Sequence, residues 1–344
     1  MPADLSLNVA PPVSGAHAKR SPWPGLLLTA ALAALAFLPR ALTGIGMLNP
    51  LVVAILLGIA LRAVMGLPAW APRGLALSQK RVLRVAIALL GLQIGMGQIA
   101  EIGLAGIAIA LTCLGATFLF TRALGRWLGV DRELTILIAA GTSICGASAI
   151  AAVNSATRAP EEDAAYAIAC ITLFGTAAML LYPLIAALLP MNAHAYGLWS
   201  GATLHEIGQA VAAAFQQGDA AGQTGTIAKL LRVAMLPAMV LLLAWRDARK
   251  CRKSGTTQAA IAMPWFVLGF VVLMILGNVI DIAPALKARA NDATIFLLCM
   301  GLAAMGMATD ITKIRAKGLR PLLVAGGGTL FISTLGLGLA LWLV

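Results

Sequence analysis

One stretch decides the fold of this chain: Gly141-Thr142-Ser143-Ile144-Cys145-Gly146-Ala147-Ser148-Ala149-Ile150. It lies in the middle of an apolar run, residues 134–154, that is long enough to cross a bilayer. Glycine and small hydroxyl residues are poor material for a helix that faces lipid, so we expect the helix to be broken here. Unwound backbone at this depth persists only where protein or a water-filled cavity surrounds it. Broken helices of this kind hold the cargo in secondary transporters.

The composition supports a membrane protein. Of 344 residues, 60% are hydrophobic and 11% are charged, which is too apolar for one soluble core. The net charge of +12 does not indicate nucleic acid, because the basic residues fall between the hydrophobic runs and are not interleaved with aromatic residues. The five cysteines form no CxxC pair, and no Walker A motif is present, so we expect no metal site, no cofactor and no ATP-driven step.

The apolar runs predict an all-α polytopic membrane protein with about 11 transmembrane segments. Residues 1–21 are predicted to form a disordered cytoplasmic tail, and residues 22–344 a transmembrane transporter domain. The expected spans are 22–39, 48–66, 82–99, 103–121, 134–154, 164–189, 196–216, 227–245, 264–283, 293–309 and 320–343.

The basic residues predict the orientation of the chain. Most of them fall in alternate connections, including the cluster Arg246–Lys253, whereas the opposite connections hold only Arg40, Arg158, Lys287 and Arg289. Positive residues stay on the cytoplasmic side of a membrane. The N-terminus is therefore expected to be cytoplasmic, in a multi-pass protein of the bacterial inner (plasma) membrane.

Two internal similarities divide the chain. The triplets 48–121 and 264–343 share Gly-Met stretches, and the charge rule gives them opposite orientations, which indicates an inverted repeat. A weaker similarity links the core segments 134–189 and 196–245, through Gly141–Cys145 and Gly201–His205. The predicted topology places these two parallel, so either one of them is re-entrant or the likeness is only shared glycine and alanine.

Small polar residues around the break are candidate anion ligands: Thr142, Ser143, Cys145 and Ser148. Free amides at the start of the second half-helix, hydroxyl groups and the positive end of the helix dipole together favour an anion. The alternative is that these small residues only let helices pack closely.

His205 and Glu206 are adjacent ionisable residues deep in an apolar run, and Gln209 lies one turn further on. Such residues normally face a cavity or a partner, and histidine titrates near neutrality. We expect the three residues to couple transport to protons. The alternative is a structural His–Glu hydrogen bond between helices.

Lys229 and Arg232 lie one helical turn apart, on one face of the next span. They are expected to draw an anion inward; the alternative is that they snorkel to the interface. Gln93 is a further candidate, whose amide would line the pathway.

The stretches 141–150, 89–95 and 201–209 together resemble the YeiH-type family of bacterial inner-membrane proteins, which are labelled putative sulfate exporters. The resemblance covers nearly everything from about residue 25 onward. More distantly, the chain is similar to the cation/proton antiporter and bile-acid symporter superfamily, which implies a panel domain, a core domain and two broken helices at the site. The superfamily's aspartate pair has no match here, so the resemblance does not extend to sodium binding.

The sequence therefore predicts a secondary active transporter, not an enzyme. Its expected partners are a small anion such as sulfate or a sulfonate, protons, the lipid bilayer and, as a homodimer, a second copy. Two alternatives stay open. One is an intramembrane hydrolase with Ser143 or Cys145 as nucleophile and His205 as base; the other is a non-transporting membrane sensor.

Overall fold

The computed structural model describes residues 21–43, 49–157, 159–239, 242, 265–280, 282–309 and 318–344. All regular structure in these ranges is helical. Residues 1–20 of the predicted tail (1–21) and the basic cluster Arg246–Lys253 lie outside them.

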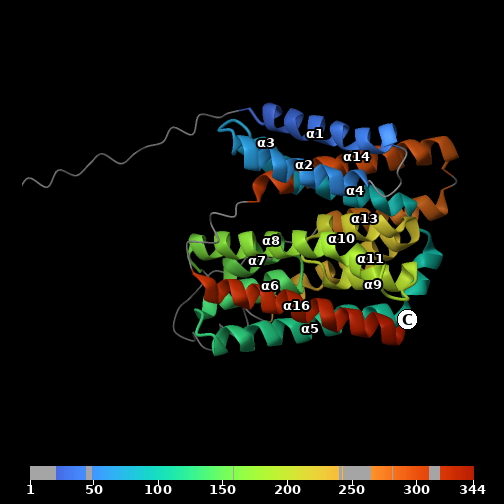
Figure 1. Cartoon of the computed structure of the whole chain (residues 1–344). Helices are drawn as coiled ribbons and strands as arrows, with labels where there is room; N and C mark the ends of the chain where they lie inside the picture. The colour runs from blue at the N-terminus through green and yellow to red at the C-terminus, as the bar shows by residue number, and fades with distance from the viewer. Residues whose placement is uncertain are drawn as a thin grey trace, which may run out of the picture.

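The helices form two layers, which we call the panel and the core (Figure 1). The panel contains α1 (Trp23–Thr43), α2 (Pro50–Met65), α3 (Pro72–Leu77), η1 (Ser78–Val82), α4 (Leu83–Leu90), η2 (Gly91–Gln93), α13 (Trp265–Val279) and α14 (Pro284–Ala308). The core contains α5 (Met96–Trp127), α6 (Arg132–Ser143), α7 (Ala147–Thr157), α8 (Glu161–Ala186), α9 (Ala193–Thr203), α10 (Ile207–Ala214), η3 (Phe215–Gln217), α11 (Asp219–Ala234) and α16 (Leu319–Leu343).

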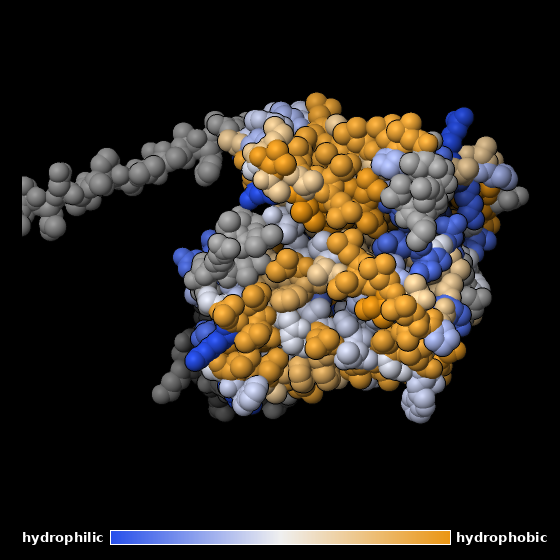
Figure 2. Space-filling view, viewed as in Figure 1, coloured by the Kyte–Doolittle hydropathy of each residue, from blue (hydrophilic) through white to orange (hydrophobic). Residues whose placement is uncertain are grey.

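The surface of the molecule is that of a membrane protein. Figure 2 shows broad hydrophobic faces along the helices, with hydrophilic residues gathered toward the two ends. In the described ranges four helices are long and apolar enough to cross a bilayer, and three shorter apolar helices accompany them. Leu104 and Trp342 are more than four-fifths exposed, a placement that lipid favours and water does not.

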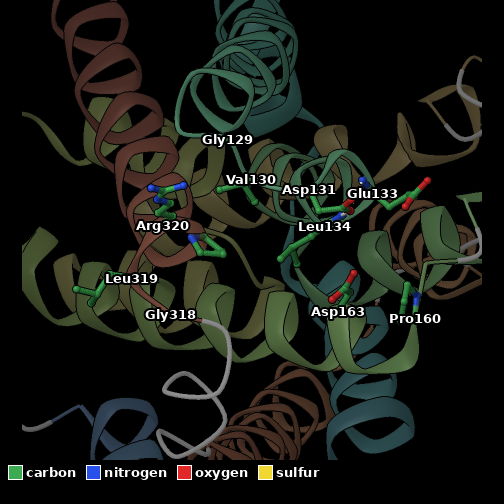
Figure 3. Close-up of a pocket in the computed structure, with 11 residues that line it drawn as sticks. Gly129, Val130, Asp131, Glu133, Leu134, Pro160, Asp163, Gly318, Leu319 and Arg320 are labelled. Atoms are coloured by element: carbon green, nitrogen blue, oxygen red, sulfur yellow. Dashed lines mark hydrogen bonds between the residues drawn. The ribbon is translucent and has the colours of Figure 1, made fainter.

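The stretch at residues 141–150 is broken, as predicted, but it does not cross the molecule. Helix α6 ends at Ser143 and α7 begins at Ala147, with Gly146 at a φ of +68° between them. The starts of α6, α8 and α16 line one pocket of about 760 Å³, so α6 and α8 begin at the same end of the molecule (Figure 3). Because α7 leads into α8 through a short connection, α7 returns to the end from which α6 entered. The expected single span is therefore a re-entrant hairpin, α6–α7.

The second motif segment is also a re-entrant hairpin, α9–α10. Gly197 packs against Ala221 and Gly201 against Gly225, so α9 and α11 run parallel. The Tyr196 hydroxyl donates to the Ala213 carbonyl over 3.1 Å, which brings the end of α10 back beside the start of α9. The two hairpins enter the core from opposite ends and meet in its middle (Figure 1). The parallel arrangement of two full spans that the charge rule suggested is wrong, because neither segment crosses.

In the panel, the helices of the two predicted triplets pack on each other through glycine. Gly58 of α2 lies against Ala303 of α14, and Gly91, at the end of α4, lies against Phe270 of α13. A side chain at either glycine would collide with backbone, so the close approach requires glycine. The order α2, α4, α5 and the order α13, α14, α16 run in opposite directions through the molecule (Figure 1).

Candidate functional site

Arg232 of α11 holds the carboxyl end of α6. Its Nε donates to the Ser143 carbonyl over 3.1 Å, and one Nη donates to the Thr142 carbonyl over 3.0 Å. Its other Nη donates to the Leu204 carbonyl, at the end of α9, over 2.9 Å. These are carbonyls that a helix leaves without internal partners, and a buried cation suits the negative end of the helix dipole.

Lys229, one turn earlier on α11, contacts the same two turns. We call these turns the hairpin tips: residues 144–146 between α6 and α7, and residues 204–206 between α9 and α10. Its Nζ lies 2.9 Å from the Ile144 carbonyl oxygen and 2.6 Å from the carbonyl oxygens of both Leu204 and His205. A carbonyl oxygen only accepts hydrogen bonds, so Nζ donates three protons and is the ammonium ion. The two cations lie on one face, as predicted, but both are fully buried, which contradicts snorkelling. The Lys229 donors are all engaged and not free for an anion.

Glu206 is a negatively charged residue at the amino ends of α7 and α10, the second helices of the two hairpins. One of its carboxylate oxygens accepts the backbone N–H of Ala147, the first residue of α7, over 2.8 Å. The same side chain caps α10 by accepting the backbone N–H of Gln209. A carboxylate of the protein thus lies where the sequence predicted that an anion would bind.

The charges at the hairpin tips do not cancel. Each helix end carries about half a unit charge. The carboxyl ends of α6 and α9 offset about one of the two charges on Lys229 and Arg232, while the amino ends of α7 and α10 add about one. With the Glu206 carboxylate counted, a residual positive charge of about one remains. Uncompensated charge in an apolar interior is costly, so the site favours a further anion.

The hydroxyl groups of the first half-helix are not free ligands, contrary to expectation. Thr142 donates to the Ile138 carbonyl over 2.9 Å and Ser143 to the Ala139 carbonyl over 2.7 Å, each one turn back along α6. Cys145 is buried. Ser148, in the first turn of α7, is exposed, and Glu206 beside that turn is half-buried. The accessible part of the motif is therefore the start of the second half-helix.

His205 and Glu206 contact different helices: His205 contacts α16 and Glu206 contacts α7. The His205 Nε2 lies 3.0 Å from the Thr329 hydroxyl of α16, which itself donates to the Ala325 carbonyl. His205 Nε2 is therefore the donor, and Nδ1 has no hydrogen-bond partner among the described residues. The structural His–Glu hydrogen bond, which was the alternative reading of these residues, is not formed among the described residues, and Thr329, a buried polar residue in an apolar helix, was not predicted as the partner of His205.

The two glutamines have different surroundings. Gln209 anchors α10 to α8: its Nε2 lies 3.2 Å from the Thr172 carbonyl and from the Thr176 hydroxyl. Its Oε1 accepts the Glu206 backbone N–H, so the Gln209 side chain helps to position Glu206. Gln93 lies in the panel, where its carbonyl accepts from Gln223 at the start of α11. It is not at the hairpin tips.

The geometry that a hydrolase would need is not formed in the described part of the chain. The Ser143 hydroxyl donates to Ala139, and the His205 Nε2 donates to Thr329. A nucleophile and its base should lie within hydrogen-bond reach of each other. Neither Ser143 nor Cys145 is so placed with respect to His205 among the hydrogen bonds of these residues.

Gly146 provides a test of the Glu206 contact. A Cβ at Gly146 would collide with the Glu206 carboxylate, whereas at Gly129, which has a similar φ of +66°, it would meet only Arg320 at an ordinary 3.7 Å. Alanine in this conformation costs about 1–2 kcal/mol at either position. We expect Gly146→Ala to lower the unfolding temperature by more than Gly129→Ala, because only at Gly146 must the Glu206 carboxylate also move. Equal losses in the two variants would contradict the contact.

An all-helical apolar chain whose opposed re-entrant hairpins meet on buried charges defines a multi-pass membrane protein. The chain belongs to the family described as Conserved hypothetical protein 698, whose model matches residues 24–325. It is 40% identical to a UPF0324 membrane protein of Pseudomonas aeruginosa over 88% of this chain and 89% of that one. Similar relatives occur in Bordetella bronchiseptica, at 38% identity over 86% and 91%, and in Listeria innocua, at 33% over 93% and 95%.

Proposed function

We propose that this protein is a proton-coupled secondary active transporter of a small anion, such as sulfate or a sulfonate, in the bacterial inner membrane. One observation carries the proposal: the Glu206 carboxylate lies on the amino ends of two half-helices, beside two fully buried cations. Amino ends of helices are ready anion sites.

The anion binds, in this proposal, at the start of α7. Ser148 is exposed there, Glu206 is half-buried, and the residual positive charge of the tips lies behind them. Lys229 and Arg232 act through their field and not by contact, because their bonds go to backbone carbonyls. This assigns binding to the Ala147 amide and the Ser148 hydroxyl, with Thr142 and Ser143 supplying the helix end that Arg232 holds.

Glu206 couples the anion to a proton. A protonated carboxyl group binds backbone N–H groups less strongly than a carboxylate does. Proton uptake therefore frees the amides of α7 and α10 for the substrate anion, and the two ligands bind together. Among the described residues, the other ionisable groups near Glu206 are Lys229 and Arg232 on α11, His205 before it in the chain, and Cys145 in the turn between α6 and α7.

The arrangement of the helices supports alternating access. Hairpins that enter from opposite ends, and triplets that run in opposite directions, are what an inverted repeat produces. The panel and the core pack on each other mainly through α10, α11, α2, α13 and α14. A core that moves against the panel would carry both hairpin tips together.

Flux measurements in proteoliposomes test this function. With purified protein in vesicles and a pH difference across the membrane, we expect sulfate or a small sulfonate to accumulate on one side without chemical change. A collapsed pH gradient should abolish the accumulation. A modified substrate would favour the hydrolase, and the absence of both flux and a modified product would favour a non-transporting sensor.

Substitution of Ser148 tests the position of the site. We expect Ser148→Leu to lower anion flux at least tenfold, because the side chain would cover the amino end of α7, while the unfolding temperature changes little at this exposed position. Thr334→Leu is the matched control, since Thr334 is an exposed hydroxyl residue on α16. Full flux in Ser148→Leu would place the anion elsewhere.

A further inference from the structure

The carboxyl ends of the two hairpins form a cluster of backbone oxygens. Within the described residues, the carbonyls of Thr142, Ser143, Ile144, Leu204 and His205 all point to side chains of α11. They come from two helices whose carboxyl ends carry partial negative charge. Carbonyl oxygens at the ends of broken helices are ligands for alkali cations in membrane transporters.

The occupant of this cluster is part of the protein. The Lys229 ammonium contacts three of the oxygens, from both hairpins, at 2.6–2.9 Å, and its side chain is fully buried. A lysine ammonium is a compact point charge with three donors, whereas the planar Arg232 fork spans the other carbonyls. In charge and in ligand type, the Lys229 Nζ is equivalent to one monovalent cation.

We propose that Lys229 fills a latent monovalent-cation site with its own ammonium group. The hairpin tips are then held together without a metal ion, and the protein needs no sodium or potassium ion to fold. Removal of the Lys229 side chain uncovers three carbonyl oxygens in an apolar interior, and an alkali cation can satisfy them. The inference depends on the tip geometry and not on which anion is carried.

The experiment compares thermal unfolding of purified protein in sodium, potassium and choline chloride at equal ionic strength. We expect the wild-type unfolding temperature to be the same in the three salts. Lys229→Ala should unfold at a lower temperature in choline chloride, and sodium or potassium should restore a large part of the loss, with saturation as the concentration rises. Choline is too large to enter the space of one ammonium group.

Lys287→Ala on α14 is the control, because this lysine is exposed and its variant should behave as wild type in every salt. Lys229→Asn is a second variant, whose shorter and neutral side chain offers two N–H donors in place of three. A wild-type protein that sodium or potassium stabilises specifically would overturn the proposal. So would Lys229 variants that gain nothing from either ion, or that fail to fold in all three salts.

Discussion

Glu206→Gln is expected to abolish proton-driven transport while leaving anion exchange intact. The amide of glutamine has nearly the same shape and is neutral, so it resembles the protonated carboxyl group and holds the N–H groups of Ala147 and Gln209 less strongly than the carboxylate does. It cannot take up a proton. Net uptake driven by a pH difference should therefore fall to the level of empty vesicles, whereas exchange of labelled for unlabelled anion should continue.

The same variant separates binding from coupling. If one proton binds with each anion, the wild-type affinity rises as the pH falls, by up to about tenfold per pH unit in the range where Glu206 is ionised. In Glu206→Gln the affinity should be independent of pH. Glu133→Gln is the matched control, since Glu133 is an exposed carboxylate at the start of the same hairpin. If uptake driven by a pH difference survives in Glu206→Gln, this residue does not couple transport to protons.

Arg232→Met should cause the largest loss of stability. The substitution keeps an unbranched side chain but removes three hydrogen bonds, which leaves the carbonyls of Thr142 and Ser143 without their Arg232 donor and takes one of two from Leu204. A buried acceptor that loses its partner costs roughly 1–3 kcal/mol. We expect a loss of about 3 kcal/mol or more in the free energy of unfolding, measured by denaturant titration in detergent.

Arg289→Met controls for the loss of a positive charge, because Arg289 is exposed on α14. Its stability should stay within about 0.5 kcal/mol of wild type, as expected for surface substitutions. Arg232→Lys should fall between the two, since an ammonium group keeps the charge without the fork that reaches both hairpins. If Arg232→Met were as stable as Arg289→Met, Arg232 would not hold the tips.

The local sequence predicted several features that the structure confirms. The density of glycine and small hydroxyl residues at 141–150 predicted the break between α6 and α7. The spacing of Lys229 and Arg232 put them on one face, because residues three apart on a helix are neighbours whatever surrounds them. The apolar composition predicted an all-helical membrane protein, since only helices and closed barrels satisfy their backbone within lipid.

Other predictions failed because the sequence left two outcomes open. Hydropathy measures how long an apolar stretch is and not whether the chain turns back within it, so the segments around 144 and 205 were assigned as spans. Thr142 and Ser143 can bond to a ligand or to their own helix, and the structure pairs them with Ile138 and Ala139. Local chemistry alone does not choose between such partners.

By itself, the sequence determined where backbone hydrogen bonding stops within the helices and which ionisable residues are buried in apolar runs. Only the tertiary structure decided what completes those free backbone groups. It placed Lys229 and Arg232 on the carboxyl ends of two hairpins and Glu206 on their amino ends, although these residues and the α6–α7 tip are far apart in the chain. The reason is physical: a free carbonyl or amide in an apolar interior requires a partner of opposite charge, but its own sequence does not specify which distant residue provides it.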